Sequence, residues 1–343
     1  MHSGHHYKLK ELLFWTRRDI FVVTLLSVVP TALYALLDWK WLAIPWQPIA
    51  ILGTAAAFIV GFRNNATYDR AWEARKIWGA IVNSSRSWGI MCKDFVRASA
   101  ENPISEEERK LISKQLVHRH VGWLTALRYQ LRQPRAWETM AQPHNIEYRE
   151  THFKVAECHV DNMGPELQKH MAKSEVEYVM KKVNKATQII NLQSKQLKDL
   201  SEQGLIENYR YVEMEKMLVD FYTQQGKCER IKNYPYPRQF ATLNLFLVRL
   251  FVIMLPFGML QVFEELVTMH HAMIWLTVPF SALVAWVFTT MERIGEATEN
   301  PFEGNANDVP ITALSRTIEI DLKDMLDEDN LPEPVQPAGS ILM

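Results

Sequence analysis

The sequence predicts an all-α membrane protein, in which four transmembrane helices accompany a large helical domain. Three observations predict this fold class. Four long apolar spans occur among the 343 residues, arranged as two separate pairs. The long polar stretch between the pairs lacks the alternating pattern that strands produce. The mean hydropathy of −0.15 averages the spans with that polar stretch and so hides the spans.

The composition excludes several other classes of protein. Lys and Arg number 38 against 39 Asp and Glu, and a formal charge of −1 does not suit nucleic-acid binding through a basic patch. With 48% hydrophobic and 22% charged residues, the chain is not largely disordered. The three cysteines, Cys92, Cys158 and Cys228, are far apart, so we expect neither a disulfide framework nor a Cys-x-x-Cys metal site.

Residues 20–62 are predicted to form transmembrane helices 1 and 2, after an N-terminal segment of residues 1–19. Eighteen uncharged residues precede Asp38, and twenty-two lie between Lys40 and Arg63. A helix needs about 20 apolar residues to cross the hydrocarbon core, so both spans are long enough. The first span lacks a small-residue cleavage site and a second span follows at once, which argues against a signal peptide.

Residues 63–238 are predicted to form a cytosolic helical domain. The second span is expected to continue as one long helix to about residue 99. The capping motif Ser-x-x-Glu begins at Ser105 and at Ser174, and from it we expect helices over 105–132 and 174–204. A further helix is expected over residues 207–231, before the prolines of KNYPYP, whereas residues 133–173 give no clear pattern.

Residues 239–291 are predicted to form transmembrane helices 3 and 4. The third span contains one charge, Arg249, and the fourth contains 26 uncharged residues. Buried helices of a soluble protein are the alternative, but those are usually shorter and amphipathic. Residues 292–330 are expected to pack on the cytosolic domain, and the proline-rich residues 331–343 are expected to be disordered.

The distribution of basic residues predicts the orientation in the membrane. Residues 63–238 hold 29 Lys and Arg against 22 Asp and Glu, and the N-terminal segment carries four further basic residues. The two hairpin loops hold a single lysine between them. Because positive residues stay cytoplasmic, both termini and the helical domain are predicted to lie inside the cell.

No motif for catalysis or for a cofactor occurs in the chain. There is no P-loop, GxSxG, HExxH or GxGxxG pattern. The histidines lack the spacing of a structural zinc site, and residues two apart do not share a helix face. We therefore expect no enzyme activity, no cofactor and no metal site.

The second span carries an unusual pattern. Small residues allow close helix approach in a membrane, and five of them lie between positions 53 and 61: Gly53, Ala55, Ala56, Ala57 and Gly61. Larger residues recur every fourth position at Thr54, Phe58 and Phe62. Periodicity leaves two interpretations open. The stripe faces the centre of an oligomer, or the small residues form a seam within one subunit and the phenylalanines face lipid.

Four motifs follow one another along the chain: GFRNNATYDRAWEARKIWGAIVNSSRSWG (61–89), CERIKNYPYPRQF (228–240), MLPFG (254–258) and ENPFEGNANDVP (299–310). These motifs resemble those of the bestrophin channel family, in its bacterial branch. The resemblance implies a homopentamer in the bacterial inner membrane, with one central pore for monovalent ions. By position, the resemblance implies a pore neck lined by Thr54, Phe58 and Phe62, where apolar rings gate by excluding water.

The resemblance also implies a second constriction, a cytosolic aperture, for which the position of the motifs indicates Ile206 and Leu205. A buried loop position is the alternative for both residues. In animal members the NPF segment forms part of an acidic calcium clasp. Here Asn305, Ala306 and Asn307 stand where that clasp would need carboxylates, so calcium gating is not expected.

Charge selectivity rests on three candidate residues. Asp69 and Glu73 continue the face of Phe62 within about 20° and would favour cations, unless nearby arginines neutralise them. Arg249 has no acidic partner in any span and would favour anions if it faces the pathway. We expect a slight preference for cations such as Na⁺ or K⁺, with a chloride channel of the same architecture as the alternative.

A protein of another class remains an alternative. A membrane-anchored interaction protein without a pore could use Trp72, Trp78 and Trp88 of the long helix as a docking surface.

Overall fold

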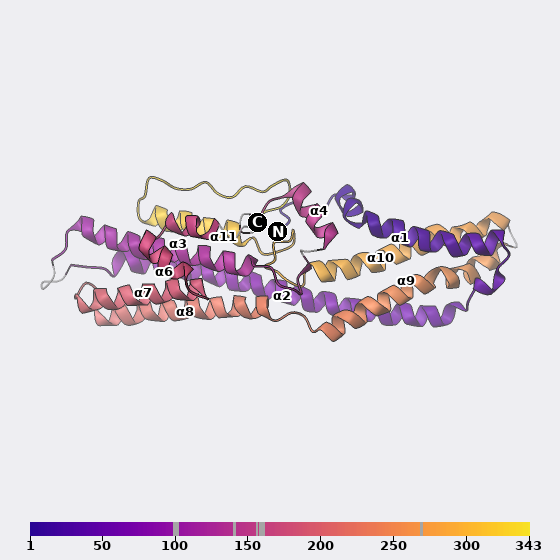
Figure 1. The fold of residues 1–343 in the computed structure, drawn as a ribbon, viewed down its shortest axis with the longest axis horizontal. Coiled ribbons are helices and arrows are strands. Elements are labelled where there is room, and N and C mark those ends of the chain that lie inside the picture. The colour runs from indigo at the N-terminus through magenta and orange to yellow at the C-terminus, as the bar shows by residue number, and fades with distance from the viewer. Residues whose placement is uncertain (99–102, 140–141, 156, 158–161, 268–269) are drawn as a thin grey trace. The chain divides into compact units, whose positions relative to one another are not determined.

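A computed structural model describes residues 1–98, 103–139, 142–155, 157, 162–267 and 270–343. The described residues are almost entirely helical, and strand-like pairing among them is limited to two isolated bridges near the chain ends. The helices are α1 (Leu9–Leu36), α2 (Trp46–Asp94), α3 (Glu106–Arg132), α4 (Pro143–His152), α5 (Met163–Gln168), α6 (Lys173–Met180), α7 (Lys185–Glu202), α8 (Asn208–Asn233), α9 (Arg238–Val267), α10 (Thr277–Ala297) and α11 (Ile311–Met325) (Figure 1).

The chain divides into two compact units. The membrane unit comprises Gly4–Arg70 and Pro235–Glu299, and the helical unit comprises Met1–Ser3, Ala71–Tyr234 and Asn300–Met343. Among the described residues, four helices are long and apolar enough to cross a membrane: α1, α2, α9 and α10. These helices coincide with the four predicted spans.

Small residues bring the helices of the membrane unit close together. A Cβ added to Gly53 of α2 would lie 2.6 Å from the ring of Phe251 on α9. A Cβ added to Gly258 of α9 would lie 2.5 Å from Ile49. Part of the predicted small-residue seam therefore lies within one subunit, between α2 and α9, because bulkier side chains would hold these backbones apart.

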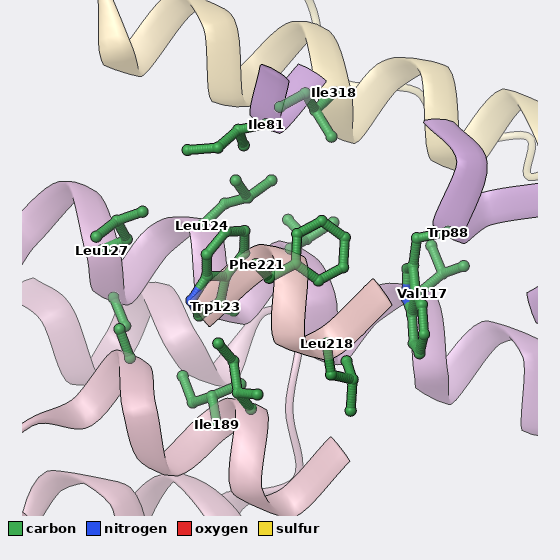
Figure 2. Close-up of a cluster of buried hydrophobic side chains, with 14 of the residues drawn as sticks. Ile81, Trp88, Val117, Trp123, Leu124, Leu127, Ile189, Leu218, Phe221 and Ile318 are labelled. Atoms are coloured by element: carbon green, nitrogen blue, oxygen red, sulfur yellow. The ribbon is translucent and has the colours of Figure 1, made fainter. Parts of the chain in front are cut away.

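The helical unit has a core of large apolar side chains. Figure 2 shows residues of α2, α3, α7, α8 and α11 that meet in this core. Trp88, Trp123 and Phe221 are each at most 1% exposed, and the indole Nε1 of Trp123 donates to Gln225 Oε1 at 2.9 Å. Because the helical unit folds in water, removal of these side chains from the solvent is the main favourable contribution to its folding.

The predicted capping box at Ser105 is confirmed. The Ser105 hydroxyl accepts from the backbone N–H of Glu108 at 3.1 Å, and α3 ends at Arg132 as expected. The continuous helix predicted over 174–204 is wrong, because α6 ends at Met180 and α7 starts after Asn184. The Asn184 side chain accepts from Thr187 N at 3.0 Å and caps a new helix.

Within residues 331–343, for which disorder is predicted, the last few residues contact the helical unit. Ile341 and Met343 are 3% and 6% exposed, and the Ala313 N–H donates to Met343 O at 2.7 Å. Ser3 N donates to Ser340 O at 2.7 Å. The last three residues are apolar, and their burial stabilises an otherwise proline-rich segment.

Candidate pore-lining surface

One face of α2 is buried inside the membrane unit. Ile49, Gly53, Ala56 and Val60 recur at helical spacing and are buried, and Ile49, Ala56 and Val60 are at most 1% exposed. Phe251 of α9 covers Gly53. These contacts fix the rotation of α2 about its own axis, so the residues on the opposite face are determined by helix geometry.

A buried ion network anchors α2 next to this face. Arg63 is 4% exposed, and its Nη1 and Nη2 lie 2.7 Å from Glu292 Oε1 and 3.2 Å from Glu299 Oε2. Glu299 also accepts from Arg238 Nη2 at 2.8 Å. Asn64 Nδ2 donates to Met291 O at 3.2 Å. Removing one partner of such a network leaves a buried charge without compensation, so these contacts hold α2 firmly to the region around α10.

The three predicted neck residues lie on the face that the subunit leaves uncovered. Phe58 and Phe62 are 64% and 69% exposed, and Thr54 is exposed as well. The Thr54 hydroxyl donates to Ala50 O at 2.9 Å. Side chains that face a pore, lipid or another subunit must be exposed on a single subunit, and this stripe meets that condition.

The three candidate selectivity charges differ in their surroundings. Asp69 is exposed and forms no ion pair with any described residue, whereas Glu73 pairs with Arg230 of α8. Arg249 is exposed on α9 between Phe246 and Ile253, which are 60% and 51% exposed, and it forms no ion pair within the described part of the chain. Asp69 and Arg249 are therefore exposed on the membrane unit without an ion-pair partner among the described residues.

The structure does not support the predicted aperture at Leu205 and Ile206. Both side chains are 2% exposed and belong to the apolar core of the helical unit. The carbonyl of Leu205 accepts from Arg97 N at 2.9 Å. A residue that lines a passage between subunits would be exposed on one subunit. The alternative, a buried position after the Gly204 turn, describes both residues.

The two carboxylates of the segment 299–310 that follow its NPF residues accept hydrogen bonds from the protein itself. Glu303 accepts from Thr139 N at 2.9 Å and from Thr139 Oγ1 at 2.8 Å. Asp308 accepts from Gly304 N at 2.7 Å and from Arg132 Nη1 at 3.1 Å. Burial and the neighbouring Asp308 raise the pKa of Glu303 to about 8. Across the described residues, no three His, Cys, Asp or Glu side chains converge to hold a metal.

The Arg63 network was missed by the sequence reasoning. Its partners Glu292 and Glu299 are 229 and 236 residues away in the chain. One sequence signal could have found it. An arginine follows the second span and acidic residues follow the fourth span, and these two span ends can meet on the same side of the membrane unit.

The comparisons with known proteins agree with this architecture. The family described as Bacterial/Fungal Bestrophin protein matches residues 13–324. The voltage-dependent anion channel-forming protein YneE of Escherichia coli K12 is 29% identical over 290 residues, which covers 84% of this chain and 80% of the relative. A voltage-dependent anion channel-forming protein of Ralstonia nicotianae is 26% identical over 329 residues, covering 94% and 91%.

A solved bacterial bestrophin homologue from Klebsiella pneumoniae has the same fold, with a TM-score of 0.72 at 22% identity over 92% of this chain and 99% of that one. The family match extends over nearly the whole chain and includes the four spans, the α2 stripe and the NPF segment. The chain therefore belongs to the bacterial and fungal bestrophin family.

Proposed function

We propose that this protein is an ion channel in which several copies place the Thr54, Phe58 and Phe62 face of α2 around a shared pathway. The observation that carries the proposal is that α2 has one covered face and one uncovered face in the membrane unit. Its opposite face is fixed by Gly53 and Arg63, and the face with two phenylalanines is uncovered. The family resemblance indicates five copies in the cytoplasmic membrane, with both termini inside.

The phenylalanines form the gate in this proposal. Phe58 and Phe62 are one helical turn apart, so an oligomer would stack two aromatic rings along the pathway. A narrow apolar passage expels water, and an ion cannot enter without its hydration shell. Thr54, one turn further out, would form a smaller and more easily hydrated ring.

Anions are the proposed substrate, in place of the cations that the sequence analysis favoured. The relatives named above are described as anion channel-forming proteins. Glu73 forms an ion pair with Arg230, which places a positive charge beside one of the two acids behind the cation preference. Arg249 presents an exposed positive charge on α9. Asp69 is the remaining opposing charge among the three candidates.

For the alternative of an interaction protein without a pore, most of the expected docking surface is buried. Trp78 and Trp88 are both 0% exposed, and only Trp72 of the three tryptophans, at 47%, lies on the outside. Ion flux separates the two classes directly.

The test is reconstitution of the full chain into liposomes, with chloride and sodium flux measured in parallel. We expect chloride flux to exceed sodium flux, and the double variant Phe58→Ala/Phe62→Ala to conduct severalfold faster, because a wider neck stays hydrated. The matched control is Leu283→Ala/Val287→Ala, which removes two exposed apolar side chains one turn apart on α10. An intact oligomer without flux would contradict the channel. Equal flux in all three proteins would place the pore on another face.

A further inference from the structure

Helix α1 presents a continuous outward face that changes from apolar to cationic. Its inner face is buried against the unit at Thr16, Val23 and Ser27. Trp286 Nε1 of α10 donates to Thr16 Oγ1 at 3.0 Å. The opposite face is apolar over four exposed residues: Phe21 at 70%, Val22 at 50%, Leu25 at 52% and Val29 at 48%.

Arg18 continues that outward face. At about 100° per residue it lies within roughly 20° of Leu25 and one turn before Phe21 and Val22, and it is exposed. Exposed Lys10 lies on the same side two turns earlier. An exposed apolar stripe thus ends in a group of cations, the order of residues that suits the boundary between hydrocarbon and head groups.

Arg17 is held in place beside Arg18. Its guanidinium carbon lies 3.9 Å from the centroid of the Phe14 ring, and Nη1 donates to Phe14 O at 2.9 Å. These contacts direct the guanidinium back toward the start of α1, away from the apolar stripe. A guanidinium held in this way loses less conformational entropy when it binds a phosphate.

The surrounding charge favours an anion. Residues 8–19 hold four basic and two acidic residues. One of the two acids, Asp19, is bound to Arg293 Nη2 at 2.6 Å, which adds a further positive charge from α10. The site is therefore cationic next to an apolar surface that reaches several turns along the helix.

We propose that Arg17 and Arg18, with Lys10, bind the phosphate of an anionic phospholipid whose acyl chains lie along Phe21 and Leu25. A lipid fits because the surface needs both an anionic group and a long apolar chain, in that order along α1. A free anion would use only the first of these features. Juxtamembrane basic residues attract anionic lipids by this mechanism. The proposal does not depend on ion conduction.

The test is native mass spectrometry of the full-length oligomer in mild detergent, titrated with phosphatidylglycerol and separately with phosphatidylcholine. We expect the wild type to prefer phosphatidylglycerol, and Arg17→Gln/Arg18→Gln to lower that affinity about tenfold without changing phosphatidylcholine binding. Lys195→Gln/Lys198→Gln is the matched control, since it removes two exposed charges from α7 of the helical unit. Arg17→Lys/Arg18→Lys should keep most of the affinity.

Three outcomes would overturn the proposal. Unchanged phosphatidylglycerol affinity in the double glutamine variant would mean that these arginines do not bind the head group. An equal loss of both lipids would indicate phosphate contact that does not distinguish an anionic lipid from a zwitterionic one. Competition by inorganic phosphate at millimolar concentration would identify a free-anion site instead. If the double variant fails to assemble, the single variant Arg18→Gln, at an exposed position, gives the same comparison.

Discussion

Helix α2 has opposite surface patterns in the two units to which it belongs. In the membrane unit, Phe58 and Phe62 are exposed and the charged Arg63 is buried. In the helical unit, Trp78 and Trp88 are fully buried and charged side chains such as Arg86 are exposed. One continuous helix, Trp46–Asp94, thus has a surface suited to apolar surroundings in one part and to water in the other.

The reversal follows from the free-energy cost of exposing apolar and charged side chains, which differs between water and a bilayer. In water, apolar surface is driven inside and charges stay hydrated. In a bilayer or a dry pore, exposed phenylalanine costs little, while an arginine needs either carboxylates within the protein, as Arg63 has, or access to water. Exposure of Phe58 and Phe62 is therefore compatible with a bilayer or a pore, whereas Trp78 and Trp88 gain stability from burial away from water.

The largest expected effect comes from comparing two arginines of α2. Arg63→Gln leaves Glu292 and Glu299 buried with less positive charge, and should destabilise the protein by about 3–5 kcal/mol. Arg86→Gln removes a pair with Asp321 at 2.7 Å whose arginine is 47% exposed, and should cost less than about 1 kcal/mol. Thermal unfolding in detergent measures both. Equal shifts would mean that burial does not distinguish the two halves of α2.

A second comparison concerns apolar residues. Ile206→Ala opens a cavity in the helical unit and should cost about 2–5 kcal/mol. Phe62→Ala removes a larger side chain that is 69% exposed, and it should cost much less in the stability of the subunit. Ion permeability should respond in the reverse order. A changed ion ranking in Ile206→Ala at unchanged stability would restore the aperture interpretation.

The third prediction concerns pH and the helical unit. The folded protein raises the pKa of Glu303 from 4.5 to about 8, so it binds this proton more tightly than the unfolded chain does. The resulting stabilisation is complete below pH 4.5 and is lost as the pH rises to about 8. Stability should fall over this range by at most about 1.4 kcal/mol per pH unit.

Glu303→Gln should flatten that dependence, because an amide does not titrate. The variant should keep its local structure, since the amide can still accept from Thr139 N and donate to Thr139 Oγ1. The control is Glu213→Gln, which breaks an exposed pair with Lys216. Unfolding midpoints at several pH values measure the slope. A wild-type slope that persists in Glu303→Gln would assign the titration to another group, with Asp308 as the first candidate.

The smallest expected effect is on ion selectivity in the membrane unit. Arg249→Gln removes an exposed charge that has no ion pair in the described part of the chain, so stability should change little. The chloride-to-sodium permeability ratio should fall roughly fivefold, equivalent to about 1 kcal/mol. Reversal potentials in planar bilayers measure the ratio, with Asp69→Asn expected to shift it the other way. Identical ratios in both variants would remove both charges from the pathway.

Much of the fold could be predicted because its signals are local. The four spans follow from runs of apolar residues, and the start of α3 follows from the four-residue Ser-x-x-Glu motif at Ser105. The prediction failed where a local signal competed with another. The motif at Ser174 resembles a helix start, yet α6 already begins at Lys173 and Asn184 starts a separate helix.

The sequence by itself determined the four spans and the stripe of Thr54, Phe58 and Phe62, because hydropathy and helical period depend only on neighbours in the chain. The tertiary structure decided which face of α2 is covered and where Ile206 lies. It also decided the pairing of Arg63 with acids more than 200 residues away. These properties depend on which distant segments pack together, and that packing sets the local dielectric and the exposure of each side chain.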